Sequence, residues 1–427
     1  MRIKAAGLCG IAIGSLTLTL GLAGVAQAEN SFGAALTGGK VSMDLRYRFE
    51  QVDQSGNGLK TANASTLRTA LGYTTGSFYN FGAMVEFENV AVIGSENYNS
   101  SVNGKSTYSK VVDPKGSEVN QGYLSYAGLD ATTLQLGRQR LTLDNHRWVG
   151  NSGWRQNEQT FDGFTAVNKS LPDTQLTYGY ISNVNRVSGD DAVDGNARMK
   201  SHLLNASYAG VPYGTITGYA YLLDYDKSAA FSQALSTQTL GVRFAGKHRI
   251  GEGVDLLYTA EYARQSDSAH NPASYDVNYI LGEFGATMSG ITAKLGYEKL
   301  GSTTGSDGNV YAVQTPLATL HAFNGWADMF LTTPTKTAAG TGGLIDEYLN
   351  VGAKPADVQL NLVYHNFKSD QGSLTYGTEW DAMVSKTWEK KYTLGLKYAA
   401  YSADKPASGF ATNFDTNKGW LWGEVKF

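Results

Sequence analysis

The sequence contains little cysteine and proline and no long apolar run beyond its start. Its single cysteine, Cys9, lies in the first segment, so disulfides, thiolate catalysis and cysteine-ligated metals are not expected in the remainder. Eight prolines in 427 residues permit long, regular strands, because proline interrupts sheet hydrogen bonding. No later apolar stretch reaches the 18 residues that indicate a transmembrane helix. The formal net charge of −3 gives no support to nucleic-acid binding.

The N-terminal segment has the layout of an export signal. Two basic residues precede an apolar stretch, which is followed by the small-residue motif Ala26-Gln27-Ala28. We therefore expect residues 1–28 to be a cleaved signal peptide and residues 29–427 to form one mature domain.

Apolar and polar positions alternate through the rest of the chain. From residue 41 to residue 50, odd positions are apolar or aromatic and even positions are polar or charged. The same alternation reaches the last segment, which closes at Phe427 and resembles the terminal strand of outer-membrane barrels. A charged strand face is costly against lipid, so it should line a wet lumen. A soluble β-sandwich also alternates, but frequent tyrosines near strand ends favour a membrane barrel with aromatic girdles.

The predicted fold is all-β: a single transmembrane antiparallel β-barrel of about 18 strands in the bacterial outer membrane. Long polar connections alternate with short ones, as expected for extracellular loops and periplasmic turns. Several segments are ambiguous, so 16 strands remain possible. In one of them, Arg138 and Arg140 share parity with two leucines, which indicates either a bulge or a strand that has left the membrane. The strands are expected to begin near residues 41, 65, 80, 118, 132, 162, 175, 201, 214, 237, 254, 276, 291, 347, 358, 378, 392 and 419.

Two regions carry a family resemblance. One is LGRQRLTLDNHRWVG at residues 136–150, followed by residues 154–163; the other is TLHAFNGWADMFL at residues 319–331, with residues 343–348. Both resemble the alginate export family of outer-membrane proteins. The resemblance implies a monomeric 18-stranded channel whose loops narrow the lumen. It also implies relatives that conduct an acidic polysaccharide through an electropositive pore.

Strand parity assigns charged side chains to the lumen, with more acids than bases. This balance does not fit a polyuronate conduit averaged over the lumen, although a few side chains at the narrowest point can dominate selectivity. Arg46, Arg48 and Arg68 lie on adjacent strands and could form a basic ladder that faces acids across the pore. The pore-lining candidates are Arg46, Arg48, Arg68, Arg243, Lys294, Lys397, Asp44, Glu86, Glu261 and Glu298.

Two long connections carry candidates for a constriction. The third long connection lies near residues 141–160. The arginines in and beside it could line the pore, or instead bind lipopolysaccharide phosphates or solvate an exposed loop. The longest connection, near residues 301–346, could form a lid, or its aromatic residues could seal the barrel wall. The loop candidates are Arg138, Arg140, Arg147, Arg155, His321, Trp326 and Asp328.

Enzymatic and cofactor motifs are weak. Asp144-Asn145-His146 offers an acid and a base without a nucleophile, so no catalytic residue is predicted. The segment at residues 190–196 has calcium-loop character but does not match the twelve-residue EF-hand pattern, and a solvated turn is favoured. No cofactor is expected.

The sequence therefore predicts a passive outer-membrane channel, similar to porins, for small polar or anionic solutes or oligosaccharides. Export of an anionic exopolysaccharide such as alginate is the alternative. A surface enzyme and a closed structural barrel are further alternatives from other classes. Expected partners are outer-membrane lipid, lipopolysaccharide and the solute, with no nucleic acid, and the expected state is a monomer.

Overall fold

The computed structural model describes residues 31–228, 231–336, 340–404, 410 and 412–427. The predicted signal peptide, residues 1–28, lies outside these residues. Within them, no helix is both long enough and apolar enough to cross a membrane.

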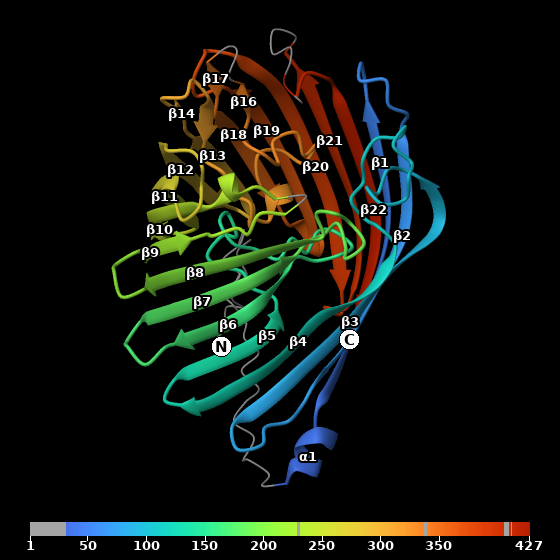
Figure 1. Cartoon of the computed structure of the whole chain (residues 1–427), viewed down its shortest axis with the longest axis vertical. Helices are drawn as coiled ribbons and strands as arrows, with labels where there is room; N and C mark the ends of the chain where they lie inside the picture. Colours follow the sequence, from blue (N-terminus) through green and yellow to red (C-terminus); the bar gives the residue numbers. More distant parts are fainter. Residues whose placement is uncertain (1–30, 229–230, 337–339, 405–409, 411) are drawn as a thin grey trace.

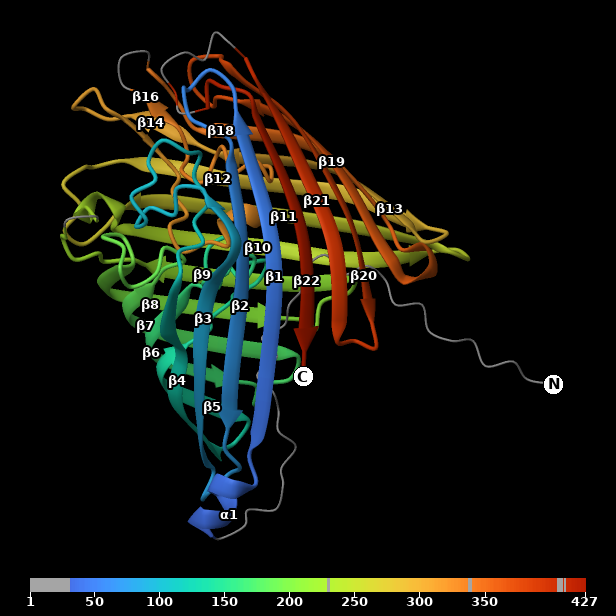
Figure 2. The same cartoon turned by 90° about the vertical axis from the view of Figure 1, so that its right-hand side faces the viewer.

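Eighteen antiparallel strands form one closed barrel, in which β1 pairs with both β2 and β22 (Figures 1 and 2). Every predicted span is present and begins within a few residues of its expected position, so 18 strands are confirmed over 16. The first nine are β1 (Lys40–Gln54), β2 (Ala62–Thr74), β3 (Phe81–Asn97), β4 (Gly116–Leu129), β5 (Thr132–Gln139), β6 (Thr160–Asn168), β7 (Thr174–Asn185), β8 (Asn196–Tyr208) and β9 (Gly214–Leu222). The others are β10 (Thr237–Ile250), β11 (Val254–Asp267), β12 (Asp276–Met288), β13 (Ile291–Leu300), β18 (Leu344–Ala353), β19 (Val358–Lys368), β20 (Thr375–Trp388), β21 (Tyr392–Ala403) and β22 (Thr416–Lys426).

A short helix, four short strands and several 3-10 turns lie outside the 18 barrel strands. A six-residue helix, α1 (Phe32–Thr37), precedes β1 (Figure 2). The ring of Phe32 packs against that of Phe78 in the β2–β3 turn. Long and short connections alternate along the chain, so the long loops gather at one end and the short turns at the other. The longest connection contains β14 (Ser302–Thr304), β15 (Val310–Ala312), β16 (Thr335–Lys336) and β17 (Thr341–Gly342), and 3-10 turns lie at Gln233–Leu235, Leu320–Ala322 and Pro355–Asp357.

Alternation decides which face of each strand is apolar. Exposed side chains such as Leu71, Phe87, Leu136 and Leu295 form the outer surface that lipid covers in a membrane barrel. The buried core lies inside the barrel instead of between two sheets. It combines inward strand residues with loop residues such as Leu317, so the lumen is packed by chain that folds into it.

The ambiguous strand β5 meets one of the two expectations at Arg140 and neither at Arg138. The register shift in the β4–β5 pairing lies between Tyr126 and Leu129, opposite the start of β5 and away from both arginines. Gly137 has φ +130°, where an added Cβ would lie 2.3 Å from the Gly122 carbonyl oxygen. The strand ends at Gln139, so Arg140 has already left it. Arg138 remains on the strand and shares the outward face of Leu136.

Candidate functional site

Two connections fold into the lumen and meet there. We call residues 140–159 the first lumen loop and residues 313–330 the second lumen loop (Figure 1). The N–H of Gly150 donates to the carbonyl oxygen of Leu317 at 2.9 Å, and the Gln159 amide donates to the same oxygen at 3.0 Å. The two loops therefore form one layer across the barrel.

Arginines of β1 hold the backbone of the first lumen loop. Arg46 donates to the side-chain oxygen of Gln156 at 3.0 Å and to the carbonyl oxygen of Gly153 at 2.9 Å. Arg48 donates to the carbonyl oxygen of Trp154. These side chains satisfy loop carbonyls that bulk water does not reach, so they anchor the loop to the wall.

Arg68 of β2 lies at the centre of a buried ion-pair group. Its guanidinium nitrogens lie 2.5 Å from Glu88, 2.9 Å from Asp44 and 2.8 Å from Glu158 of the first lumen loop. Burial alone would raise the pKa of Glu158, but Arg140 and Arg68 together lower it to about 2. The loop carboxylate is therefore ionised at neutral pH and ties the loop to β2.

Arg140 is the most accessible arginine of this group. It lies 2.5 Å from both Glu158 and Glu86, and its side chain keeps 33% of its exposure. Arg48 and Arg68 each keep only 1%. A solute in the lumen can therefore meet Arg140, whereas Arg48 and Arg68 are covered by the loop.

The first lumen loop reaches the opposite wall through Arg147 and Trp148. Arg147 lies 2.8 Å from Glu298 of β13, and the Trp148 indole N–H donates to Glu261 of β11 at 2.9 Å. Arg243 of β10 lies 3.3 Å from the same Glu261 and retains 18% exposure. The loop thus spans the lumen, and Arg243 adds a second accessible guanidinium.

The second lumen loop is held by a chain of buried polar groups. The Nζ of Lys397 on β21 lies 2.7 Å from His321 Nε2, and His321 Nδ1 lies 2.7 Å from Asp328. Burial is the main cause that lowers the pKa of His321 to about 3, against the opposing effect of Asp328. The neutral ring therefore accepts from the ammonium and donates to the carboxylate. Lys397 also lies 3.7 Å from the ring centre of Trp326, and Arg155 pairs with Asp328 at 3.0 Å.

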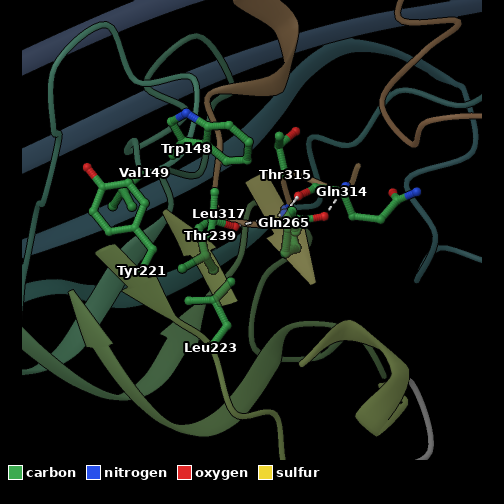
Figure 3. A pocket seen from close by; sticks show the side chains of 10 residues that line it. Trp148, Val149, Tyr221, Leu223, Thr239, Gln265, Gln314, Thr315 and Leu317 are labelled. Atoms are coloured by element: carbon green, nitrogen blue, oxygen red, sulfur yellow. Dashed lines mark hydrogen bonds between the residues drawn. The ribbon is translucent and has the colours of Figure 1, made fainter. Parts of the chain in front are cut away.

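A small cavity marks the junction between the loops and the wall of β9–β11 (Figure 3). Its volume of about 10 Å³ admits at most one water molecule. Gln265 of β11 and the backbone of Gln314 exchange two hydrogen bonds beside it, each 2.8 Å long. The loops are therefore packed closely against the wall at this point.

Most sequence-predicted residues converge on this loop layer or the lumen wall beside it, with one correction. Arg138 does not enter the lumen: it lies on the outer face of β5 and pairs with Asp162 of β6 at 2.8 Å. Its parity with Leu136, which the sequence interpretation assigns to a bulge or a strand end, is kept on a regular strand. Lys294 faces the lumen and pairs with Glu283 at 2.8 Å, away from the loops. Residues that the sequence interpretation missed are Asp113, Glu158, Glu283 and Asp346. Parity could have identified the last two, and nothing local marks Asp113.

The weaker motifs gain no support. Asp144 accepts a hydrogen bond from Asn205 at 2.7 Å, and burial raises the pKa of Asp144 while lowering that of His146. The Asn196 amide donates to Asp190 at 3.1 Å within the predicted calcium segment. Across the described ranges, no group of three or more histidine, cysteine or acidic residues is arranged to hold a metal ion.

Comparisons with solved structures match the barrel almost end to end. OccAB2 of Acinetobacter baumannii is 14% identical, with 92% of this chain and 99% of that chain covered at a TM-score of 0.71. Pseudomonas aeruginosa OpdK, solved with vanillate, is 14% identical, with 92% and 99% covered at 0.67. Pseudomonas aeruginosa OccK9 (OpdG) is 15% identical, with 92% and 100% covered at 0.66. At these identities the likeness establishes the fold.

Comparison with protein-family models establishes the family, which the solved structures do not. No curated protein matched the sequence. The model of the alginate export family matches residues 39–281, which is more than half of the chain and runs from β1 into β12. The chain belongs to the alginate export family and is a β-barrel protein of the bacterial outer membrane.

Proposed function

We propose that the protein is a passive outer-membrane channel for small polar or anionic solutes, narrowed by the two lumen loops. The observation that carries this proposal is the accessible guanidinium of Arg140 beside the loop layer, with Arg243 on the opposite wall. Channel selectivity depends on charged rings at the narrowest part of the pore, and a guanidinium matches the geometry of a carboxylate.

The fold relatives support the solute class. OpdK, which shares the barrel architecture, was solved with vanillate, a small organic anion. By analogy we assign small anions with carboxylate groups to this channel. Such a solute exchanges part of its hydration shell for contacts with lumen side chains, which lowers the barrier to crossing.

Single-channel recording in planar bilayers tests the proposal. We expect an open pore that prefers anions, and we expect Arg140→Gln to reduce this preference several-fold, because it leaves Glu158 and Glu86 with less compensating charge. Arg138→Gln is the matched control, since it removes an arginine from the outer face. Absence of conductance, or equal selectivity in all three proteins, would refute the proposal.

Export of an anionic exopolysaccharide is a second candidate, and membership of the alginate export family favours it. The packed loop layer and the lumen acids argue against a wide polyuronate path. Block of the current by oligouronates at micromolar concentration would favour export, whereas unchanged current would favour the small-solute channel. Catalysis is not proposed, because Asp144 and His146 have separate surroundings.

We further propose that residues 1–28 are removed on export and that the mature barrel acts as a monomer in contact with lipopolysaccharide. An intact mass that begins at Glu29 and light scattering of the purified protein test the first two statements. Co-purification of lipopolysaccharide after washing tests the third.

A further inference from the structure

Two carboxylates on β20, Glu379 and Asp381, hold the turn of the second lumen loop. Glu379 Oε1 accepts a hydrogen bond from the N–H of Ala327 at 2.6 Å, and Asp381 Oδ2 accepts one from the N–H of Trp326 at 3.1 Å. Gly325 permits this approach: its φ is +84°, and an added Cβ would lie 2.4 Å from Glu379 Oε2. The loop is therefore seated directly on the two carboxyl groups.

The other oxygens of this pair, Glu379 Oε2 and Asp381 Oδ1, accept no hydrogen bond from any residue that the structure describes. Both residues are fully buried. The two side chains lie two positions apart on the same face of β20 and accept from the adjacent N–H groups of Trp326 and Ala327, so the carboxyl groups are neighbours. Adjacent buried carboxylates cannot both ionise without a large cost. One shared proton gives one of these oxygens a donor role and the other an acceptor role.

The charged groups around the pair show which of the two carboxylates a cation could balance in place of the proton. The titratable groups that face the pair are His365 on β19, Asp346 on β18, Lys397 and Tyr401 on β21, and Asp328 in the second lumen loop. His365 lies between Asp346 at 2.9 Å and Asp381 at 3.6 Å. Lys397 is a nearby cation, whereas Asp328 is paired with Arg155 and Lys418. Lys397, and His365 when it is protonated, thus face Asp346 and Asp381, and the charged groups beside Glu379 are the acids Asp381 and Asp328.

We propose that Glu379 and Asp381 are positioning residues that share one proton, and that this proton keeps the second lumen loop seated in the channel. Loss of the proton at alkaline pH places a second negative charge beside the first. The carboxylates then separate, the backbone hydrogen bonds to Trp326 and Ala327 weaken, and the loop loosens. The consequence for conductance rests on the proposed channel function, but the anchoring of the loop does not.

Hydrogen–deuterium exchange of the mature protein in detergent micelles tests the anchoring. Exchange over residues 320–331 is followed from about pH 7 to about pH 10, with correction for the chemical exchange rate. We expect the wild-type segment to exchange roughly tenfold faster at the upper end, since a hydrogen bond to a charged group is lost. Glu379→Gln should stay slow throughout, because its amide donates to Asp381 permanently. Residues 145–157 of the first lumen loop serve as an internal control.

Each outcome decides the proposal. A flat wild-type profile overturns it, and so does equal acceleration in wild type and Glu379→Gln, which would assign the response to His365, Lys397 or Tyr401. Folding of each variant is checked by gel electrophoresis, in which a folded barrel changes its mobility on heating. If Glu379→Gln does not fold, Asp381→Asn provides the same fixed hydrogen-bond donor. In bilayers, wild-type conductance should rise with pH and that of the variant should not. A protein that never conducts refutes the channel function, while the exchange profile still decides the anchoring.

Discussion

The two lumen loops are held against the barrel wall by opposite charges. Arg46 and Arg48 of β1 donate to carbonyl oxygens of the first lumen loop. Glu379 and Asp381 of β20 accept from backbone N–H groups of the second. A backbone that enters a lumen must satisfy its polar groups away from bulk water, and charged partners form the stronger hydrogen bonds. The wall therefore presents cations where a loop turns its carbonyls outward and anions where it turns its amides outward.

This comparison separates two roles that arginines inside the barrel can have. Arg48 and Arg140 both point into the barrel region, but one keeps 1% of its exposure and the other 33%. The covered arginine anchors a loop, whereas the accessible one can meet a solute. An inward charge is therefore not by itself a selectivity residue.

The largest expected effect on the free energy of unfolding comes from removing an arginine that holds the first lumen loop. Arg68→Gln leaves three carboxylates near the first lumen loop with less compensation, and we expect it to lower the free energy of unfolding by about 3–5 kcal/mol. Arg138→Gln, in a partly exposed pair on the outer face, should cost about 1 kcal/mol or less. Denaturant unfolding in lipid vesicles measures both. Similar losses in the two variants would contradict the anchoring role of Arg68.

A matched glycine pair should distinguish the two loops at a smaller cost. Gly325→Ala places a side chain at a left-handed φ against Glu379, and we expect a loss of about 1–3 kcal/mol with faster proteolysis of the second lumen loop. Gly153→Ala in the first lumen loop meets only the Asn151 amide at 3.1 Å, and a change below about 1 kcal/mol is expected. Equal sensitivity to protease would show that the carboxylates do not seat the second loop closely.

Acid should loosen the second lumen loop before the first. Burial holds the pKa of His321 at about 3, below its usual 6.5, so its contribution is complete above pH 6.5 and is lost as the pH falls toward 3. In the first lumen loop, Arg140 and Arg68 outweigh the effect of burial and lower the pKa of Glu158 from 4.5 to about 2. The contribution of Glu158 to stability is therefore lost only below pH 4.5. Hydrogen exchange of each loop at pH 7, 5.5 and 4 measures the order. Simultaneous loosening of both loops, or an unchanged order in His321→Gln, would contradict these assignments.

The strands and their faces were predictable because they depend on neighbours in the chain. Alternation with a period of two decides which side chains point inward, and it located all 18 strands and most lumen charges. It did not place Arg138, because a charged side chain with the parity of Leu136 indicated either a bulge or a strand that had left the membrane. The family resemblance at residues 136–150 and 319–331 marked the two segments that fold inside.

What the sequence alone determined was the barrel and most of the charges inside it, whereas the choice of 18 strands over 16 came from the structure. Only the tertiary structure decided which charges are covered, because that depends on where two loops lie. Arg46 meets Gln156 across 110 positions of sequence, and Trp148 meets Glu261 across 113. Such contacts exist only after closure of the barrel brings distant walls together. Burial of a charge follows from those contacts, since its partner, and not its own strand pattern, removes it from water.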